Sequence, residues 1–407
     1  MNSLTSCSLA KKYKPSVTNL QELLQTQAVS LTALPPLALY IHFPWCEKKC
    51  PYCDFNSHQI KKGGINQSGF DEKRYIQALI KDLETELPNI WGRQVHSIFI
   101  GGGTPTLIAP KEIIRLLKSL EADFGFAKDI EITIEANPDS VTLEKLKELR
   151  SGGINRISFG MQSSVSHVLK VLDRTHNPAN VESAVNSARA AGFSEINLDL
   201  IYGTPGESIA DWESSIRAAL SLPITHISAY ALILEDGTKL ANQVKRKEFE
   251  VPDDGEAADK YLLADKKFRE NGFTWYELSN WSQPGSECRH NLAYWRGANW
   301  WGLGPGAHSH INGKRFWNIK HPNSYQKALM EGSPKAGEEM LSSEEKESER
   351  IMLEIRLPSG IKLASLKSDQ AEKLSEFLEA GELDARLWES GIVALTPKGR
   401  LVADRIV

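Results

Sequence analysis

The sequence predicts an α/β protein whose main domain is a partial, six-stranded (β/α)6 barrel. Short apolar runs rich in β-branched residues alternate with segments of helical period along residues 38–232, and repeated strand–helix alternation implies a parallel sheet. Glycine or polar motifs follow the ends of most of these runs. A barrel gathers such residues from all its strands on one face, whereas an open sheet would concentrate them at one switch point.

Length, charge and cysteine usage bound the possible classes of protein. A chain of 407 residues can hold one large domain and a smaller one, and a net charge of −4 provides no basic field for nucleic acid. No apolar run reaches membrane-spanning length. Five cysteines, three of them clustered, suit a reducing compartment. These features favour a cytoplasmic protein that does not bind nucleic acid, and they are compatible with peripheral membrane association and with a homodimer.

The expected elements follow one another in a regular order. Residues 1–36 read as a poorly ordered N-terminal arm, and the barrel domain spans 37–270. The expected strands are 38–43, 95–100, 130–136, 156–159, 196–201 and 226–232. The expected helices are 72–87, 111–124, 143–150, 181–191, 209–220 and 256–270.

Two further regions follow the barrel. Residues 271–335 are rich in tryptophan and glycine and show few regular periods; six of the ten tryptophans lie between Trp275 and Trp317. Residues 336–407 resemble a small helical domain with a β-wing, and their expected helices are 343–353, 368–378 and 383–390, with the wing at 391–399. Winged helices often bind DNA, but the mixed charge of this segment favours packing or docking.

Cys46, Cys50 and Cys53 form a C-x3-C-x2-C motif directly after the first expected strand. Three thiolates suit a cubic iron–sulfur cluster in which one iron stays open for chemistry. A zinc site with His58 as the fourth ligand and a redox-active cysteine pair are the alternatives. The two remaining cysteines are distant in the chain, so the clustering argues against ordinary buried thiols.

The cysteine motif, with the aromatic Tyr52 before its last cysteine, resembles that of the radical S-adenosylmethionine superfamily. The resemblance implies a TIM-like radical SAM barrel and a 4Fe-4S cluster whose open iron chelates S-adenosylmethionine. Gly101-Gly102-Gly103-Thr104 follows the second expected strand, where glycines let the backbone approach a ligand closely. In the superfamily such a loop holds the amino group of S-adenosylmethionine.

Four residues at or near the strand ends, Glu135, Gln162, Arg174 and Asp199, narrow the resemblance from the superfamily to one family. Together with Tyr40, they match the oxygen-independent coproporphyrinogen III dehydrogenase family, which acts in porphyrin biosynthesis. They offer carboxylates for hydroxyl groups, and amide and guanidinium donors for a carboxylate. The resemblance therefore implies that S-adenosylmethionine is bound by Tyr40, Tyr52, Gly102, Gly103, Thr104, Glu135, Gln162, Arg174 and Asp199.

The sequence departs from the dehydrogenase pattern just after the cluster motif. Dehydrogenases of this family carry a further cysteine two residues after the third, whereas this chain has Cys53-Asp54-Phe55. That sequence instead resembles the sister branch, the haem chaperones of the HemW type. Residues 290–295 match the H-N-x-x-Y-W motif of that branch, which implies haem binding by His290, Asn291, Tyr294 and Trp295 and makes 271–335 the expected haem-binding region. Histidine is a common axial ligand of haem iron, and flat aromatic side chains suit a porphyrin.

Three function classes follow. The first is a haem chaperone that holds a 4Fe-4S cluster with S-adenosylmethionine and delivers haem to acceptor proteins. The second is an enzyme, an oxygen-independent coproporphyrinogen III dehydrogenase that decarboxylates two propionates oxidatively. The third is a cofactor-free interaction protein that uses its C-terminal domain. Phe55 and the H-N-x-x-Y-W match favour the chaperone, and therefore a protein that is not an enzyme.

Overall fold

The computed structural model describes residues 36–60, 70–90, 92–174 and 176–406. The expected N-terminal arm, 1–36, lies outside the described residues except for its last residue. Within the described ranges, no helix has the length and apolar character needed to cross a membrane.

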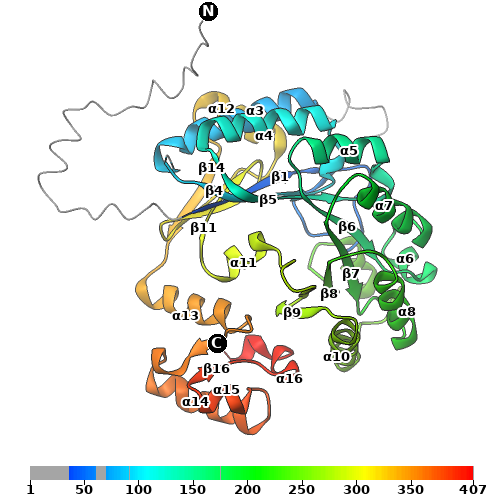
Figure 1. The fold of residues 1–407 in the computed structure, drawn as a ribbon, viewed down its shortest axis with the longest axis vertical. Helices are drawn as coiled ribbons and strands as arrows, with labels where there is room; N and C mark the ends of the chain where they lie inside the picture. The colour runs from blue at the N-terminus through cyan, green and yellow to red at the C-terminus, as the bar shows by residue number, and fades with distance from the viewer. Residues whose placement is uncertain (1–35, 61–69, 91, 175, 407) are drawn as a thin grey trace, which may run out of the picture.

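The predicted parallel sheet is present, with its strands neighbouring one another in chain order. Its strands are β1 (Leu37–Phe43), β4 (Val95–Gly102), β5 (Phe126–Ala136), β6 (Arg156–Gln162), β7 (Glu195–Tyr202) and β8 (His226–Ala231). The connecting helices are α3 (Glu72–Ile90), α4 (Pro110–Phe124), α5 (Leu143–Ser151), α6 (Ser166–Val171), α7 (Pro178–Ala190) and α8 (Ile209–Leu220). They cover the outer face of the curved sheet (Figure 1). The predicted fold class is confirmed.

Residue alternation along the strands separates two environments. In β4, Ile98 and Ile100 belong to the main hydrophobic core beneath the outer helices, whereas Ser97 and Phe99 face the inside of the barrel and contact His290. This two-residue period is what a strand between an apolar layer and a functional interior requires. The inner face is therefore lined with polar and aromatic side chains.

The sheet extends beyond the parallel strands at both edges, giving twelve strands in the order β14-β13-β12-β11-β1-β4-β5-β6-β7-β8-β10-β9. The strands added to the predicted six are β9 (Thr274–Glu277), β10 (Asn280–Ser282), β11 (Asn299–Leu303), β12 (His308–Ile311), β13 (Lys314–Asn318) and β14 (Lys335–Met340). Strand β11 pairs parallel with β1, and β12 to β14 continue the sheet antiparallel. The tryptophan-rich region 271–335, expected to show few regular periods, thus contributes five strands, and β14 begins at its last residue.

The remaining helices complete the barrel and the C-terminal domain. Around the barrel are α9 (Lys239–Lys245), α10 (Asp254–Glu270), α11 (Arg289–Trp295) and α12 (Pro322–Glu331), and short strands β2 (Trp45–Cys46) and β3 (His58–Gln59) flank the cysteine loop. Figure 1 shows α11 inside the curve of the sheet. The C-terminal elements are α13 (Ser343–Glu354), β15 (Ile361–Lys362), α14 (Ser368–Glu379), α15 (Ala385–Glu389), β16 (Ile392–Val393) and α16 (Pro397–Arg400).

The C-terminal segment has its own small core, in which Ile351, Ile355 and Val393 are buried. Strands β15 and β16 pair antiparallel; β16 lies within the expected wing at 391–399, whereas β15 precedes α14 in the chain. The segment contacts the barrel through Arg400, whose guanidinium lies 3.7 Å from the centre of the Trp275 ring and 2.8 Å from a carboxylate oxygen of Asp265. This buried contact joins the second core to helix α10 and strand β9.

Candidate cluster and cofactor site

The loop that carries the three cysteines is held by backbone contacts. Strands β2 and β3 pair on either side of it, and the Cys53 amide donates to the Cys50 carbonyl at 3.2 Å. Lys49 Nζ donates to the carbonyls of Phe55 and Ser57 at 3.0 and 3.2 Å. Backbone pairing and the Lys49 bonds therefore hold the loop, and the three thiols stay partly exposed.

The three cysteines lie on one cavity of about 480 Å³ at the carboxyl ends of the parallel strands. Eight residues expected to bind S-adenosylmethionine also line it: Tyr52, Gly102, Gly103, Thr104, Glu135, Gln162, Arg174 and Asp199. Tyr40 does not line the cavity. Its hydroxyl bonds to His42 Nδ1 at 2.9 Å and its ring stacks on Phe99. Tyr40 thus lies in the barrel interior next to the cavity wall.

The glycine loop packs against the strand that leads into the cysteine loop. Gly102 has a φ of +111°, and a Cβ atom there would lie 2.6 Å from the His42 ring. The amides of Gly103 and Thr104 donate to the carbonyls of Phe43 and Trp45 at 2.6 and 2.8 Å. Only glycine tolerates both the left-handed backbone and this close approach. The glycine loop and the cysteine loop are therefore joined directly.

Arg174 connects the cysteine loop to the end of strand β6. Its Nη1 donates to Cys50 Sγ at 3.5 Å and its Nη2 donates to the Gly160 carbonyl at 3.0 Å. A Cβ atom on Gly160 would lie 2.8 Å from the Gln162 amide nitrogen, and Gln162 itself has a φ of +64°. The turn after β6 is thus shaped so that a guanidinium and an amide reach the cavity.

Two carboxyl groups are buried in the cavity wall. Burial raises the pKa of Glu135 to about 8, with the neighbouring Asp199 charge adding to the rise, although the Gly102 amide donates to Glu135 at 3.0 Å. Burial also raises the pKa of Asp199, while hydrogen bonds from Ser158 and Asn197, both at 2.7 Å, favour its ionised form. At neutral pH, Glu135 is therefore largely protonated in the ligand-free site.

The site fits a cluster better than a single metal ion. Across the described part of the chain, no group of three or more His, Cys, Asp or Glu side chains is arranged to hold one metal ion. The thiolates of a cubane bind different iron atoms and need not converge on one point. Cys46, Cys50 and Cys53 share one cavity wall, with Arg174 supplying positive charge beside Cys50. This donor set suits three corners of a 4Fe-4S cluster.

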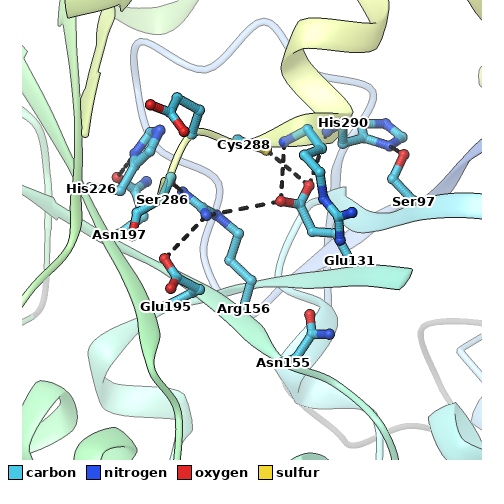
Figure 2. A network of polar contacts seen from close by, with 12 residues as sticks. Ser97, Glu131, Asn155, Arg156, Glu195, Asn197, His226, Ser286, Cys288 and His290 are labelled. Carbon is cyan, nitrogen blue, oxygen red and sulfur yellow. Dashed lines mark hydrogen bonds and ion pairs between the residues drawn. The ribbon is translucent and has the colours of Figure 1, made fainter. Parts of the chain in front are cut away.

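The H-N-x-x-Y-W motif, residues 290–295, lies within helix α11, and this helix is anchored inside the barrel. The carboxylate of Glu131 accepts the amides of Arg289 and His290 at 3.0 and 2.9 Å (Figure 2). The same carboxylate lies 3.9 Å from Arg156, which also pairs with Glu195 at 3.5 Å. The buried network in Figure 2 thus fixes the first turn of α11 to strands β5 and β6.

His290 itself is buried and hydrogen-bonded through both ring nitrogens. Its Nδ1 lies 3.0 Å from Ser97 Oγ, and its Nε2 lies 3.0 Å from the Tyr294 hydroxyl. Burial lowers the pKa of His290 to about 3. Asn291, Tyr294 and Trp295 are partly exposed. In this structure His290 therefore holds Tyr294 and offers no free ring nitrogen to a ligand.

Sequence reasoning missed several residues that shape the site. Ser158 and Tyr230 line the cavity, and Asn197 binds both Ser158 and Asp199 at 2.7 Å. The signal for them was present: Asn197 and Asp199 alternate with apolar residues in β7, as inward-facing positions of a strand do. Polar residues at every second position of an otherwise apolar barrel strand indicate the functional interior.

Comparisons with known proteins agree with this geometry. Residues 40–219 match the Radical SAM superfamily. The chain is 42% identical over 373 residues to the heme chaperone HemW of Mycobacterium tuberculosis, covering 91% of this chain and 94% of that protein. It is 32% identical over 378 residues to HemW of Bacillus subtilis, covering 90% and 97%.

Among solved structures, the fold is similar to that of the coproporphyrinogen III oxidase HemN from Escherichia coli, described as a radical SAM enzyme. The TM-score is 0.79 at 23% identity, covering 95% of this chain and 92% of the other. At this identity the likeness concerns the fold. The identity and coverage with the chaperones are far higher than a shared fold requires, and the chain therefore belongs to the HemW family of the radical SAM superfamily.

Proposed function

We propose that this protein is a haem chaperone, which binds haem and a 4Fe-4S cluster with S-adenosylmethionine and delivers haem to acceptor proteins. The observation that carries the proposal is the 42% identity to a heme chaperone over 91% of the chain. The position of Phe55 supports it, because its exposed side chain lies at the mouth of the cavity where dehydrogenases carry a further cysteine.

Cys46, Cys50 and Cys53 would hold the cluster. The glycine loop would hold S-adenosylmethionine, together with four further residues of the cavity: Glu135, Gln162, Arg174 and Asp199. When bound, such a cluster would supply reducing electrons to S-adenosylmethionine. Arg174 offsets thiolate charge at Cys50 and keeps the cysteine loop against β6. Tyr40 would act indirectly, through its hydrogen bond to His42, whose ring lies against Gly102 of the glycine loop. The residues of helix α11 belong to the haem site in this proposal.

Haem titration of the full chain, purified without oxygen, tests the function directly. We expect a saturable shift of the Soret band and transfer of the bound haem to an added apo-haem protein. A Soret band that remains that of free haem at every protein concentration would contradict the proposal.

The coproporphyrinogen dehydrogenase is the second candidate, favoured by the cavity residues that its family shares. Phe55 argues against this enzyme, because phenylalanine cannot replace the thiol of the further cysteine that the dehydrogenases carry at this position. Anaerobic incubation of reconstituted protein with coproporphyrinogen III distinguishes the two functions. We expect no vinyl product from protein with an intact cluster, and formation of vinyl product would favour the enzyme.

The proposal includes a cytoplasmic location, with a homodimer and peripheral membrane association as further parts. The share of charged residues, 25%, supports an aqueous environment, and the exposed apolar side chains of Val251 and Met330 are available for contact with another surface. Sedimentation with anionic vesicles and light scattering of the purified chain test these two associations separately.

A further inference from the structure

We propose that haem binds on the inner face of strands β11, β12 and β13, with His310 Nε2 as a ligand of the haem iron. This face, named here the β11–β13 inner face, consists of Trp300, His308, His310, Arg315 and Trp317. The inference rests on the proposed function and gives it a site. His290 then acts as a positioning residue, which holds the neighbouring helix rather than the iron.

The strand register places these side chains on the same side of the sheet as the barrel interior. Trp300 pairs with Ala38 of β1, which in turn pairs with Ser97 of β4, and Ser97 contacts His290 inside the barrel. Across the antiparallel strands, His310 pairs with both Trp300 and Arg315. Residues in register on adjacent strands project to the same face, so Trp300, His310 and Arg315 form one row.

His308 and Trp317 lie two residues further along the same strands and pair with each other. Their rings stack at a centroid distance of 5.7 Å and an interplanar angle of 24°. The two-residue period puts them on the same face as the first row. The face therefore presents two histidines and two tryptophans, and both tryptophans are partly exposed.

His310 is in the state that a metal-binding histidine needs. Its Nδ1 lies 3.2 Å from the carbonyl oxygen of Ala298. A carbonyl can only accept, so Nδ1 carries the proton and Nε2 keeps its lone pair. Histidines that bind metals commonly donate their other ring nitrogen to a backbone carbonyl in this way. Partial burial lowers the pKa of His310, and the charges of Arg315 and Lys346 lower it further, although the hydrogen bond to the Ala298 carbonyl raises it. The lowered pKa favours the neutral ring.

The surroundings of His310 suit an amphipathic, flat ligand. The Trp300 ring lies 4.9 Å from the His310 ring, and Trp300 in turn lies 4.9 Å from Tyr294 of helix α11. On the polar side, Arg315 pairs with Glu339 at 3.3 Å and with Glu349 of α13, so part of its charge is neutralised.

Lys346 of α13 adds positive charge close to this face: its Nζ lies 3.3 Å from where a Cβ atom on Gly313 would be, in the turn between β12 and β13. Aromatic walls for the porphyrin and cations at the edge for its propionates match the chemistry of haem.

The H-N-x-x-Y-W motif acquires a physical role in this arrangement. His290 Nε2 bonds to the Tyr294 hydroxyl, Tyr294 packs edge-on against Trp300, and Trp300 contacts His310. The motif histidine, 1% exposed, therefore orients the aromatic wall beside the iron ligand. This explains how a buried histidine with both nitrogens engaged can belong to a haem site.

Haem titration of the full chain with its cluster reconstituted without oxygen tests the assignment, using His310→Ala, His290→Ala and His167→Ala. His167 lies on helix α6, is exposed and pairs with Asp211 at 3.3 Å, and so serves as the matched histidine control. We expect His310→Ala to weaken haem binding at least tenfold and to remove the histidine-ligated Soret and resonance Raman signature. Added imidazole should restore that signature, because it replaces the missing ligand.

We expect His290→Ala to keep the histidine-ligated spectrum with a lower affinity, and His167→Ala to match the wild type. Equal iron content of the cluster in all variants shows that the barrel is intact. The assignment is overturned by a wild-type spectrum and affinity in His310→Ala, or by loss of the histidine signature in His290→Ala alone. No haem binding by the wild type would instead overturn the proposed function itself.

Discussion

Arg174 donates a hydrogen bond from its Nη1 to the Sγ atom of Cys50, at 3.5 Å. A second bond to the Gly160 carbonyl fixes the guanidinium from the other side. Arg174 therefore holds the cysteine loop in position and places positive charge next to the Cys50 sulfur. This pair of contacts leads to the first prediction.

Replacing Arg174 by Met should lower the reduction potential of the cluster. Hydrogen bonds and positive charge at the cluster sulfurs stabilise the reduced, more negative state. A hydrogen bond to a charged group contributes on the order of 1.5 kcal/mol, which corresponds to a decrease of about 60 mV for one electron. Anaerobic redox titration measures the change. Arg174→Lys should recover part of it, and an unchanged potential in Arg174→Met would contradict the role given to this contact.

Glu135→Gln should stabilise the ligand-free protein at alkaline pH. Burial is the main cause that raises the pKa of Glu135 in the folded protein to about 8. At any pH between the unfolded pKa and about 8, unfolding therefore releases the proton of this carboxyl group. Stability from this group is therefore lost as pH rises from about 4.5 to 8. We expect the melting temperature of Glu135→Gln to exceed that of the wild type at pH 8.5 and to match it near pH 4.5. An equal difference at both values would show that the carboxyl group does not titrate as described.

Gly102→Ala should disrupt the joined glycine and cysteine loops. The new Cβ would meet the His42 ring at 2.6 Å and the residue would keep a φ of +111°. Gly206→Ala is the matched control, since Gly206 has a φ of +79° but open space around it. We expect the control to lose about 1 kcal/mol from backbone strain alone. Gly102→Ala should lose more and bind less iron, as shown by denaturation and iron analysis; equal losses would contradict the steric argument.

Glu131→Ala should release the first turn of α11 and weaken haem binding. The substitution leaves the amides of Arg289 and His290 and the buried Arg156 without this carboxylate; removal of one partner of a buried ion pair typically costs about 3–5 kcal/mol. Glu195→Ala removes the second carboxylate that pairs with Arg156, whereas the amides at the start of α11 bond to Glu131. Haem titration and thermal unfolding of both variants separate the two effects. Similar haem affinities in the two variants would show that the anchoring of α11 is irrelevant to haem.

The barrel could be predicted from the sequence because its strands and helices carry strong local periods. Strand-end residues such as Glu135 and Asp199 could be assigned to one site, since the carboxyl ends of parallel strands share an edge. The extension β11–β14 could not be predicted, because its strands are short and β11 pairs with β1, more than 250 residues earlier in the chain. Long-range pairing of this kind leaves no local signal.

The environment of individual side chains also could not be predicted from the sequence. The motif around His290 was identified as a haem motif, but the two hydrogen bonds that occupy its ring depend on Ser97 and on the position of α11 inside the barrel. Conversely, nothing in the local sequence distinguishes His310 from His308; only the Ala298 carbonyl, brought near by the sheet, fixes one ring nitrogen of His310. Tertiary contacts decide which histidine is available to a metal.

The most direct measurement is Mössbauer and paramagnetic resonance spectroscopy of the chain purified and reconstituted without oxygen, compared with Cys50→Ala and Cys288→Ser. Cys288 is buried at the N-terminal end of α11 and does not line the cavity, so it serves as the control. We expect the wild type and Cys288→Ser to contain a 4Fe-4S cluster with about four irons per chain, whose signal changes when S-adenosylmethionine is added, and Cys50→Ala to lose it. Absence of this cluster from the reconstituted wild type, or its survival in Cys50→Ala, would contradict a cluster held by Cys46, Cys50 and Cys53.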